Sequence, residues 1–270
     1  MNVILPSALV FVKRVYWGFM PMPDYRKPLN IAHRGASAYA PENTLAAVRL
    51  ALAMGADGFE LDVMLSADGH LVVIHDDTVD RTTDGSGPVQ QKTLAELKAL
   101  DAGARFDARF AGERIPTLQE VFDLMAGNSA LVNVEIKTDS FKGDGLEEKL
   151  VAQIRRYGLG ERLLISSFNP FALWRMRRLA PDLPLALLYA ENLRVHLRNR
   201  WFAFLSRPDA LNPSFRMATQ KHVCWAKSKG YRLYVWTVDE EPEMRRLIAL
   251  GVEGIVTNKP DLLRQVLARS

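Results

Sequence analysis

The sequence predicts a (β/α)8 TIM barrel, an α/β fold in which eight parallel strands alternate with helices. Short apolar runs typical of buried strands alternate with segments of helical periodicity from residue 29 to the end of the 270-residue chain. Several of the helical segments are followed by glycine, the residue that adopts a left-handed helix C-terminus at the lowest cost. These glycines are Gly55, Gly127, Gly158, Gly230 and Gly251. Such alternation over one domain favours a closed parallel barrel.

The predicted strands cover, in chain order, residues 29–32, 58–65, 71–75, 131–136, 163–167, 185–189, 210–212, 232–237 and 254–256. The helices expected between them include 44–54, 117–126, 146–157, 171–179, 219–229 and 242–250. This gives one strand too many for a barrel of eight. An antiparallel hairpin accounts for the extra strand, because Asp68-Gly69 separates two alternating apolar runs and is a strong hairpin signal. With these two residues as the turn, 65 pairs with 72, 63 with 74 and 62 with 75.

Ahead of the barrel domain, residues 29–270, the chain carries an apolar and basic segment, residues 1–28. Its two apolar runs flank Lys13-Arg14 and are each shorter than the roughly 20 residues that span a bilayer. Positive charge follows the first run instead of preceding it, which disfavours a signal peptide. We expect this segment to pack on the barrel floor, with a shallow membrane contact through residues 1–22 as the alternative.

The composition is that of an ordinary globular protein, with 48% hydrophobic and 24% charged residues. The single cysteine, Cys224, excludes an internal disulfide and favours a reducing compartment, so we expect a cytoplasmic protein, with peripheral attachment to the membrane as the variant. The net charge of +4 arises from basic residues within 1–30 and 191–222. Nucleic acid is not an expected partner, since no dense basic stripe interleaved with aromatic residues is present.

Acidic residues interrupt two of the predicted buried strands. Glu60 and Asp62 are two residues apart and therefore share one face of their strand, and the hairpin register places Asp62 opposite His75. Glu135 and Lys137 alternate in the same way on strand 131–136. Burial of an unpaired ion is costly, so we expect both side chains to point into a polar site.

His33 and Arg34 directly follow the first predicted strand, and the carboxyl ends of barrel strands line the active face. Three carboxylates without a thiolate suit Mg²⁺ or Ca²⁺. Arg34 and Lys137 offer donors to a phosphate, and two histidines can accept and donate protons near neutral pH. The set predicts metal-assisted cleavage of a phosphoester. Each residue also has a purely structural interpretation; Arg34, for example, could simply pair with Glu42.

Ordered motifs from about residue 31 to residue 260 resemble the glycerophosphodiester phosphodiesterase family, within the phospholipase C-like phosphodiesterase barrels. The motifs are His33-Arg34-Gly35-Ala36, Pro41-Glu42-Asn43-Thr44, Glu60-Leu61-Asp62-Val63, His75-Asp76-Asp77, Arg81-Thr82-Thr83, Ile115-Pro116-Thr117-Leu118, Asn133 to Lys137, Ser166-Ser167-Phe168, Trp236-Thr237-Val238 and Thr257-Asn258-Lys259-Pro260.

The resemblance implies hydrolysis of small glycerophosphodiesters to glycerol 3-phosphate and an alcohol. It implies divalent-cation ligands at Glu60, Asp62 and Glu135, and an acid–base pair at His33 and His75. By the same resemblance, Arg34 and Lys137 contact phosphate. Trp236 lines the substrate cleft, with a place in the barrel wall as the alternative. Residues 76–114 form a small cap inserted after the third strand segment. Asn212 and Asp239 depart from the usual family pattern.

Two alternatives remain open. One is a lysophospholipase D at a membrane surface. In that case residues 193–205 form an amphipathic basic helix that contacts anionic lipid. The competing interpretation of residues 193–205 is an ordinary barrel helix that packs its apolar face on the sheet. The other is a barrel that binds phospho-ligands without catalysis.

Overall fold

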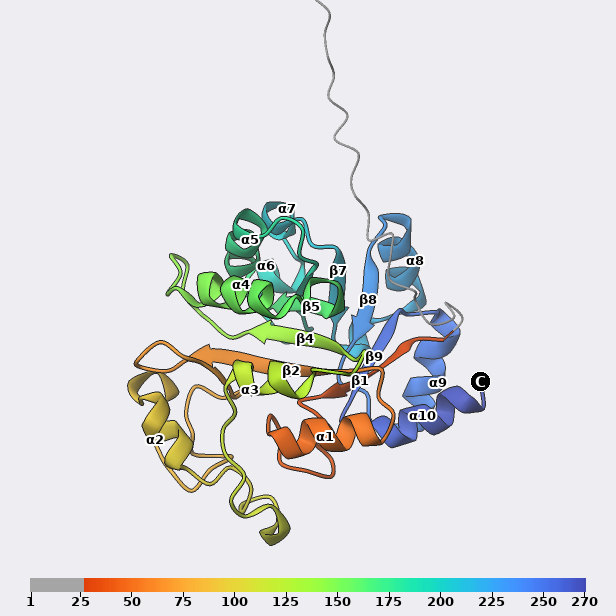
Figure 1. Ribbon diagram of the computed structural model, residues 1–270. Coiled ribbons are helices and arrows are strands. Elements are labelled where there is room, and N and C mark those ends of the chain that lie inside the picture. Colours follow the sequence, from red (N-terminus) through yellow and green to blue (C-terminus); the bar gives the residue numbers. More distant parts are fainter. Residues whose placement is uncertain (1–26) are drawn as a thin grey trace, which may run out of the picture.

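The computed structural model describes residues 27–270 and confirms the barrel (Figure 1). Eight parallel strands form it, with β1 pairing with both β2 and β9 to close the sheet. The eight are β1 (Leu29–His33), β2 (Gly58–Leu65), β4 (Leu131–Ile136), β5 (Leu163–Ser167), β6 (Leu185–Tyr189), β7 (Ala210–Pro213), β8 (Arg232–Val235) and β9 (Gly254–Thr257). The predicted contact through residues 1–22, and all but the last two residues of the segment 1–28, lie outside the described residues.

Helices follow the strands and cover the outside of the barrel (Figure 1). Threonine caps three of the longer ones, accepting a backbone hydrogen bond at Thr44, Thr117 and Thr219. The longer helices are α1 (Leu45–Ala53), α3 (Leu118–Leu124), α4 (Leu146–Tyr157), α5 (Pro170–Leu179), α8 (Gln220–Ser228), α9 (Glu241–Leu250) and α10 (Pro260–Ala268). Short 3-10 turns occur at η1 (Val89–Gln91), η2 (Ala108–Phe110), η3 (Gly160–Arg162) and η4 (Phe215–Met217).

The extra strand, β3 (Leu71–Val73), pairs antiparallel with β2, as the hairpin prediction requires. The predicted register was wrong by one residue, because residue 65 pairs with 71 and residue 63 with 73. The amide of Ser66 donates to the carbonyl of His70 at 2.9 Å, so the loop has three residues and Gly69, at φ +78°, takes its left-handed position. Asp62 consequently faces Ile74, whose amide donates to the Asp62 carbonyl at 3.1 Å, and not His75.

The continuous amphipathic helix predicted over residues 193–205 is also not formed. The segment contains two short helices, α6 (Val195–Arg198) and α7 (Ala203–Ser206). Between them Arg200 adopts a left-handed backbone at φ +57°, which ends the first helix. Its guanidinium lies 4.5 Å from the ring centroid of Tyr189 and 4.9 Å from that of Trp225, so cation–π contacts hold the turn.

Two apolar layers position the site. Inward-facing side chains such as Ile31, Leu164 and Tyr234 fill the barrel, while a larger cluster packs between strands and helices. Residues 76–114, which lie between β3 and α3, include α2 (Leu94–Ala99) and contribute to a separate small cluster together with residues of β2 and β3. Within residues 27–270, no helix combines the length and apolar character needed to cross a bilayer.

Candidate active site

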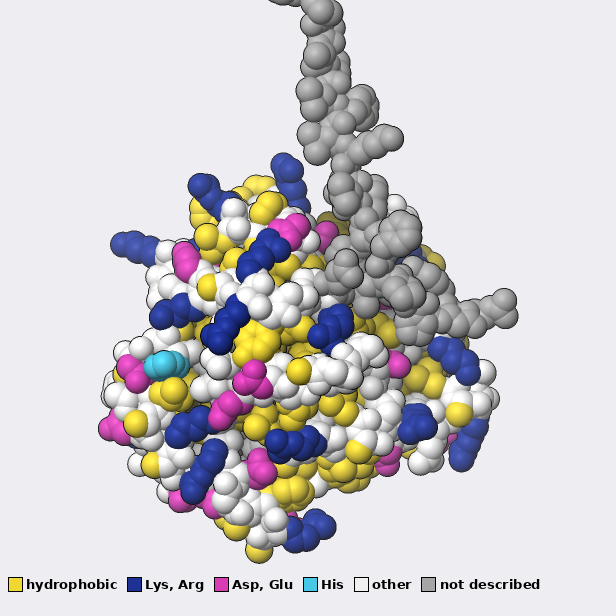
Figure 2. Space-filling view, in the orientation of Figure 1, with side chains coloured by type: hydrophobic (Ala, Val, Ile, Leu, Met, Phe, Trp, Pro, Cys, Tyr) yellow, Lys and Arg dark blue, Asp and Glu magenta, His cyan; other side chains and the backbone are white. Residues whose placement is uncertain are grey.

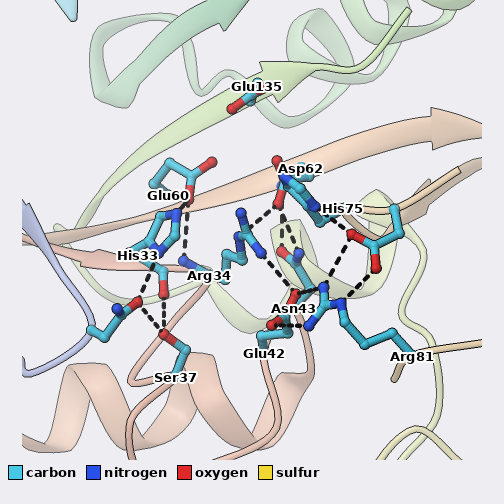
Figure 3. Close-up of polar contacts among 12 residues, drawn as sticks. His33, Arg34, Ser37, Glu42, Asn43, Glu60, Asp62, His75, Arg81 and Glu135 are labelled. Carbon is cyan, nitrogen blue, oxygen red and sulfur yellow. Dashed lines mark hydrogen bonds and ion pairs between the residues drawn. The ribbon is translucent and has the colours of Figure 1, made fainter. Parts of the chain in front are cut away.

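Three buried carboxylates meet inside the mouth of the barrel. The parallel register sets Asp62 of β2 beside Glu135 of β4, and Glu60 lies two residues before Asp62, on the same face. One oxygen from each of the three lies within 4.8 Å of the others. Their exposed fractions are only 5% for Glu60, 1% for Asp62 and 8% for Glu135. The convergence expected from the alternating acidic positions is therefore present (Figure 3).

The donor set fits a divalent cation. Oδ1 of Asp62 is buried and accepts no hydrogen bond from residues 27–270. The Lys137 ammonium lies 3.0 Å from Glu135 Oε1 and 3.8 Å from Asp62 Oδ1, which balances only part of the negative charge. Carboxylate oxygens that are buried and unpaired are costly without a counter-charge, and they are the ligands preferred by Mg²⁺ and Ca²⁺.

The same crowding alters the acidity of two carboxylates. Burial raises the pKa of Glu60 well above its usual range, and the charges of Asp62 and Glu135 raise it further. Burial, followed by the charge of Asp62, raises the pKa of Glu135 to about 7. Three like charges in one buried space resist ionisation, so a bound cation would restore the charged forms.

Arg34 connects this cluster to the loop after β1. Its amide donates to Glu60 Oε2 at 3.1 Å, and its guanidinium lies 3.3 Å from Asp62 Oδ2. Nη1 also donates to Glu42 Oε1 at 2.9 Å, so the simple pairing with Glu42 is present alongside the contacts with the cluster. Glu42 contacts the guanidinium of Arg34 through Nη1 alone. The positive charge of Arg34, which is partly buried, therefore lies at the edge of the carboxylate cluster.

His33 lies beside Glu60, with its Nε2 3.9 Å from Glu60 Oε2. Its Nδ1 lies 2.7 Å from Oδ1 of Asn258, an oxygen that also accepts from Ser37 Oγ. Because an amide oxygen only accepts, Nδ1 carries the proton of a neutral ring. Burial, and then the charge of Arg34, lower the pKa of His33 to about 4, which keeps the ring neutral.

His75 has a different partner. Its Nδ1 lies 2.6 Å from Oδ1 of Asp76, a carboxylate oxygen that accepts a hydrogen bond from the Nδ1 proton. Arg81 donates to Asp76 at 2.6 Å and to both oxygens of Glu42, at 2.7 and 2.8 Å. A chain of contacts thus runs from His75 through Asp76, Arg81 and Glu42 to Arg34 (Figure 3). His75 is not paired directly with Asp62.

Trp236, which directly follows β8, donates from Nε1 to the carbonyl of Asn212 at 2.7 Å. Its ring meets Phe168 edge-on at a centroid distance of 5.5 Å, and Lys137 Nζ lies 6.0 Å from the Phe168 centroid. The same ring packs against the apolar cluster inside the barrel. Trp236 thus borders both the interior core and the neighbourhood of Lys137.

Four polar residues of the site received no role from the sequence. Asn43 donates to Asp62 Oδ2 at 2.8 Å, while Asp76 and Arg81 hold His75 and Asn258 holds His33. Asn258 directly follows β9, so the rule that selected His33 from the carboxyl end of a strand would have selected it too. Asn43 and Arg81 lie in loops, where the sequence carries no periodic signal for orientation.

Comparison with known proteins agrees with this geometry. Residues 33–262 match the glycerophosphoryl diester phosphodiesterase family. A glycerophosphodiester phosphodiesterase of Caldanaerobacter subterraneus is 48% identical over 239 residues, covering 88% of this chain and 96% of the relative. One from Bacillus subtilis is 36% identical and covers 92% of this chain and 89% of its own length.

Among solved structures, an Oleispira antarctica phosphodiesterase in complex with the product sn-glycerol-3-phosphate is similar, with a TM-score of 0.78 and 33% identity. The alignment covers 90% of this chain and 97% of that one. Fold, ordered motifs and near full-length similarity lead to one assignment. The chain belongs to the glycerophosphoryl diester phosphodiesterase family.

Proposed function

We propose that this protein hydrolyses glycerophosphodiesters to glycerol 3-phosphate and an alcohol, with a divalent cation and two histidines. The observation that carries the proposal is the convergence of Glu60, Asp62 and Glu135, with one buried oxygen, Asp62 Oδ1, that has no hydrogen-bond donor among the described residues. Family membership supplies the substrate class, since relatives of similar length bear the name of this activity. The presence of every carboxylate and both histidines disfavours a barrel that only binds phospho-ligands.

Glu60, Asp62 and Glu135 would hold the cation, Mg²⁺ or Ca²⁺. When bound, it supplies Lewis-acid stabilisation of the charge on the phosphoryl oxygens. The chain adds two cations of its own: Arg34 and Lys137 stand beside the carboxylates and are placed to donate hydrogen bonds to the phosphate. These fixed charges favour the transition state, in which negative charge grows.

We infer the roles of the two histidines from their hydrogen-bond partners. His33, with its Nδ1 proton directed to Asn258, presents a free lone pair on Nε2 and takes the proton of the attacking oxygen, either from water or from the neighbouring hydroxyl of the glycerol. His75, oriented by its hydrogen bond to the carboxylate of Asp76, gives a proton to the departing alcohol oxygen. When water attacks, the new phosphorus–oxygen bond replaces the bond to the alcohol, and glycerol 3-phosphate forms directly. When the glycerol hydroxyl attacks, the alcohol leaves from a cyclic phosphate, which a water molecule then opens to glycerol 3-phosphate as the two histidines exchange their roles.

We also propose that residues 76–114 act as a small cap beside the site. Asp76 of this insertion is hydrogen-bonded to His75, and Arg81 donates to both Asp76 and Glu42, which couples the insertion to the catalytic end of the barrel. Trp236 would line the substrate cleft next to Lys137 and Phe168. The packed rings of Phe141, Phe171 and Phe202 form an aromatic surface near the barrel mouth, which favours a lysophospholipid as the second candidate substrate.

The test is a chelator-treated protein offered glycerophosphocholine, lysophosphatidylcholine and bis(nitrophenyl) phosphate, with Mg²⁺, with Ca²⁺ and with neither. We expect glycerol 3-phosphate to be released from glycerophosphocholine only when a cation is present. Turnover that resists chelation would contradict the cation assignment. Absence of turnover on every diester with every cation would contradict catalysis itself, and preference for the lysophospholipid would select the second candidate.

A further inference from the structure

We propose that an aromatic rim at the mouth of the barrel docks the protein on an anionic lipid surface. The aromatic rim consists of Phe141, Phe171, Trp201, Phe202 and Phe204. Three of its members are strongly exposed, with exposed fractions of 72% for Phe141, 57% for Trp201 and 69% for Phe204. This inference goes beyond the reaction, because it concerns where the enzyme works and not what it cleaves.

Three rings of the rim pack against one another, and Trp201 and Phe204 flank Phe202 in the sequence. The rings of Phe141 and Phe171 have centroids 5.0 Å apart, and those of Phe171 and Phe202 are 5.6 Å apart. Asn169 fastens the loops below them, donating from Nδ2 to the carbonyls of Thr138 and Ser140 at 3.0 and 3.2 Å. Exposed aromatic rings fixed in this way present apolar area that water solvates poorly.

The rim lies at the catalytic end of the barrel. Phe141 belongs to the loop after β4, Phe171 to the first turn of α5 after β5, and Phe202 to the connection after β6. All three follow carboxyl ends of strands, the end at which the carboxylates gather. Docking through this surface would turn the mouth of the barrel toward the lipid.

The surrounding charge selects an anionic partner. Residues 191–207 contain four arginines and one glutamate, and that glutamate, Glu191, pairs with Arg216 at 3.4 Å. Arg194, Arg198 and Arg207 are exposed, as is Lys142 beside Phe141. Asp139 and Asp144 accompany Lys142 in its loop, so the positive excess lies mainly in the segment that carries α6 and α7. Figure 2 shows hydrophobic side chains flanked by Lys and Arg at the end of the molecule where these helices lie.

An ordinary barrel helix does not account for this surface. A helix that covers the sheet turns its large apolar residues inward, as α5 does with the buried Leu173 and Met176. In α6 and α7, Val195 and Phe204 remain exposed at 47% and 69%. A tryptophan, here Trp201, together with phenylalanine and arginine, is the combination that settles at the headgroup level of a bilayer.

The experiment is sedimentation of the full-length protein with vesicles of phosphatidylcholine alone or mixed equally with phosphatidylglycerol. We expect binding to the anionic vesicles that weakens with added salt. The double variant Trp201→Ala/Phe204→Ala should lower the partition coefficient at least about tenfold. Arg194→Glu and Arg198→Glu should each lower it roughly fivefold or more. Leu179→Ala is the matched control, because Leu179 is 41% exposed at the opposite end of α5.

The proposal is overturned if the full-length protein does not sediment with anionic vesicles. It is also overturned if the double variant binds as well as the unaltered protein, since attachment would then lie elsewhere in the chain. Unchanged turnover of a water-soluble diester by the double variant would show an intact fold. Should that variant fail to fold, Trp201→Phe provides a second measurement. Lipid should shift the tryptophan emission of the unaltered protein to the blue, and this variant should lose most of the shift.

Discussion

The backbone amide of Arg34 donates a hydrogen bond to Oε2 of Glu60 across 3.1 Å. The bond requires the loop after β1 to turn back on the strand, and Arg34 accordingly has a left-handed backbone at φ +55°. Gly35 follows at φ +81°, so two successive residues with positive φ aim the amide at the carboxylate. The position of this carboxylate, and with it the charge balance of the site, thus depends on the backbone of the His33-Arg34-Gly35 turn.

Gly35→Ala should therefore damage both stability and activity. A Cβ atom at Gly35 would lie 2.6 Å from the carbonyl carbon and 2.7 Å from the Cβ of Ala47, in a loop fixed by a hydrogen bond from Ala36 to Ala47. We expect a loss of about 2–4 kcal/mol in the free energy of unfolding, from overpacking added to the cost of positive φ. Urea denaturation measures the loss.

Gly127→Ala is the matched control for that change. Gly127 has a similar φ of +85°, but a Cβ atom added there would have no atom of residues 27–270 within 4 Å, so only the backbone cost of about 1 kcal/mol applies. Equal denaturation midpoints for the two variants would contradict the close approach of Ala47 as the reason for glycine at residue 35.

Glu60→Gln should separate charge repulsion from cation binding. The variant removes one of three buried ionisable carboxyl groups, while the amide oxygen of glutamine can still accept from Arg34. Without cation we expect a higher melting temperature than that of the unaltered protein, because repulsion among the carboxylates is relieved. The unaltered protein should gain about 2.7 kcal/mol of stability at a cation concentration a hundredfold above Kd, and the variant much less.

Differential scanning calorimetry with and without Mg²⁺ or Ca²⁺ measures both effects. Glu148→Gln, on the exposed side of α4, is the control and should keep the cation-dependent rise. If Glu60→Gln responded to cation as strongly as the unaltered protein, Glu60 would not be a ligand.

The sequence predicted most of the barrel because its signals are local and repeated. Strand β2 was found at its observed bounds, and the alternation of Glu60 with Asp62 placed both on the inner face. The hairpin register failed because Asp68-Gly69 is compatible with a two-residue or a three-residue loop, and only the hydrogen bond from Ser66 to His70 decides between them. The apolar period of residues 193–205 is helical, but stacking of Arg200 on Tyr189 breaks the helix. Arg200 also stacks on Trp225, which lies well beyond the segment, so the apolar period of residues 193–205 does not reveal this contact.

Acid should weaken the bridge that holds His75. Hydrogen bonds from Arg81 lower the pKa of Asp76 to about 2. Burial raises the pKa of Glu42, but the hydrogen bonds and charges of Arg81 and Arg34 outweigh it and lower that pKa to about 2 as well. Both carboxyls have lower pKa values when folded than when unfolded. Their stabilising contribution is therefore complete above about pH 5 and is lost as the pH falls toward 2.

Arg81→Met removes this contribution. We expect the melting temperature of the variant to lie below that of the unaltered protein at pH 6, and the difference to shrink steadily toward pH 2. Because half of the Arg81 side chain is exposed, added salt should also reduce the difference. A difference that stays constant from pH 6 to pH 2 would show that Arg81 acts through packing and not through its two carboxylates.

Leaving groups of different basicity should distinguish the two histidines. His33→Asn and His75→Asn should each lower kcat on glycerophosphocholine by about 10²–10⁴-fold. A nitrophenolate leaves without a proton, so a nitrophenyl phosphodiester should restore most of the activity of His75→Asn and little of that of His33→Asn. His70→Asn, on the exposed hairpin turn, should match the unaltered protein on both substrates. Equal impairment of His75→Asn on both substrates would contradict its role as the acid, because that role matters only when the departing oxygen is strongly basic.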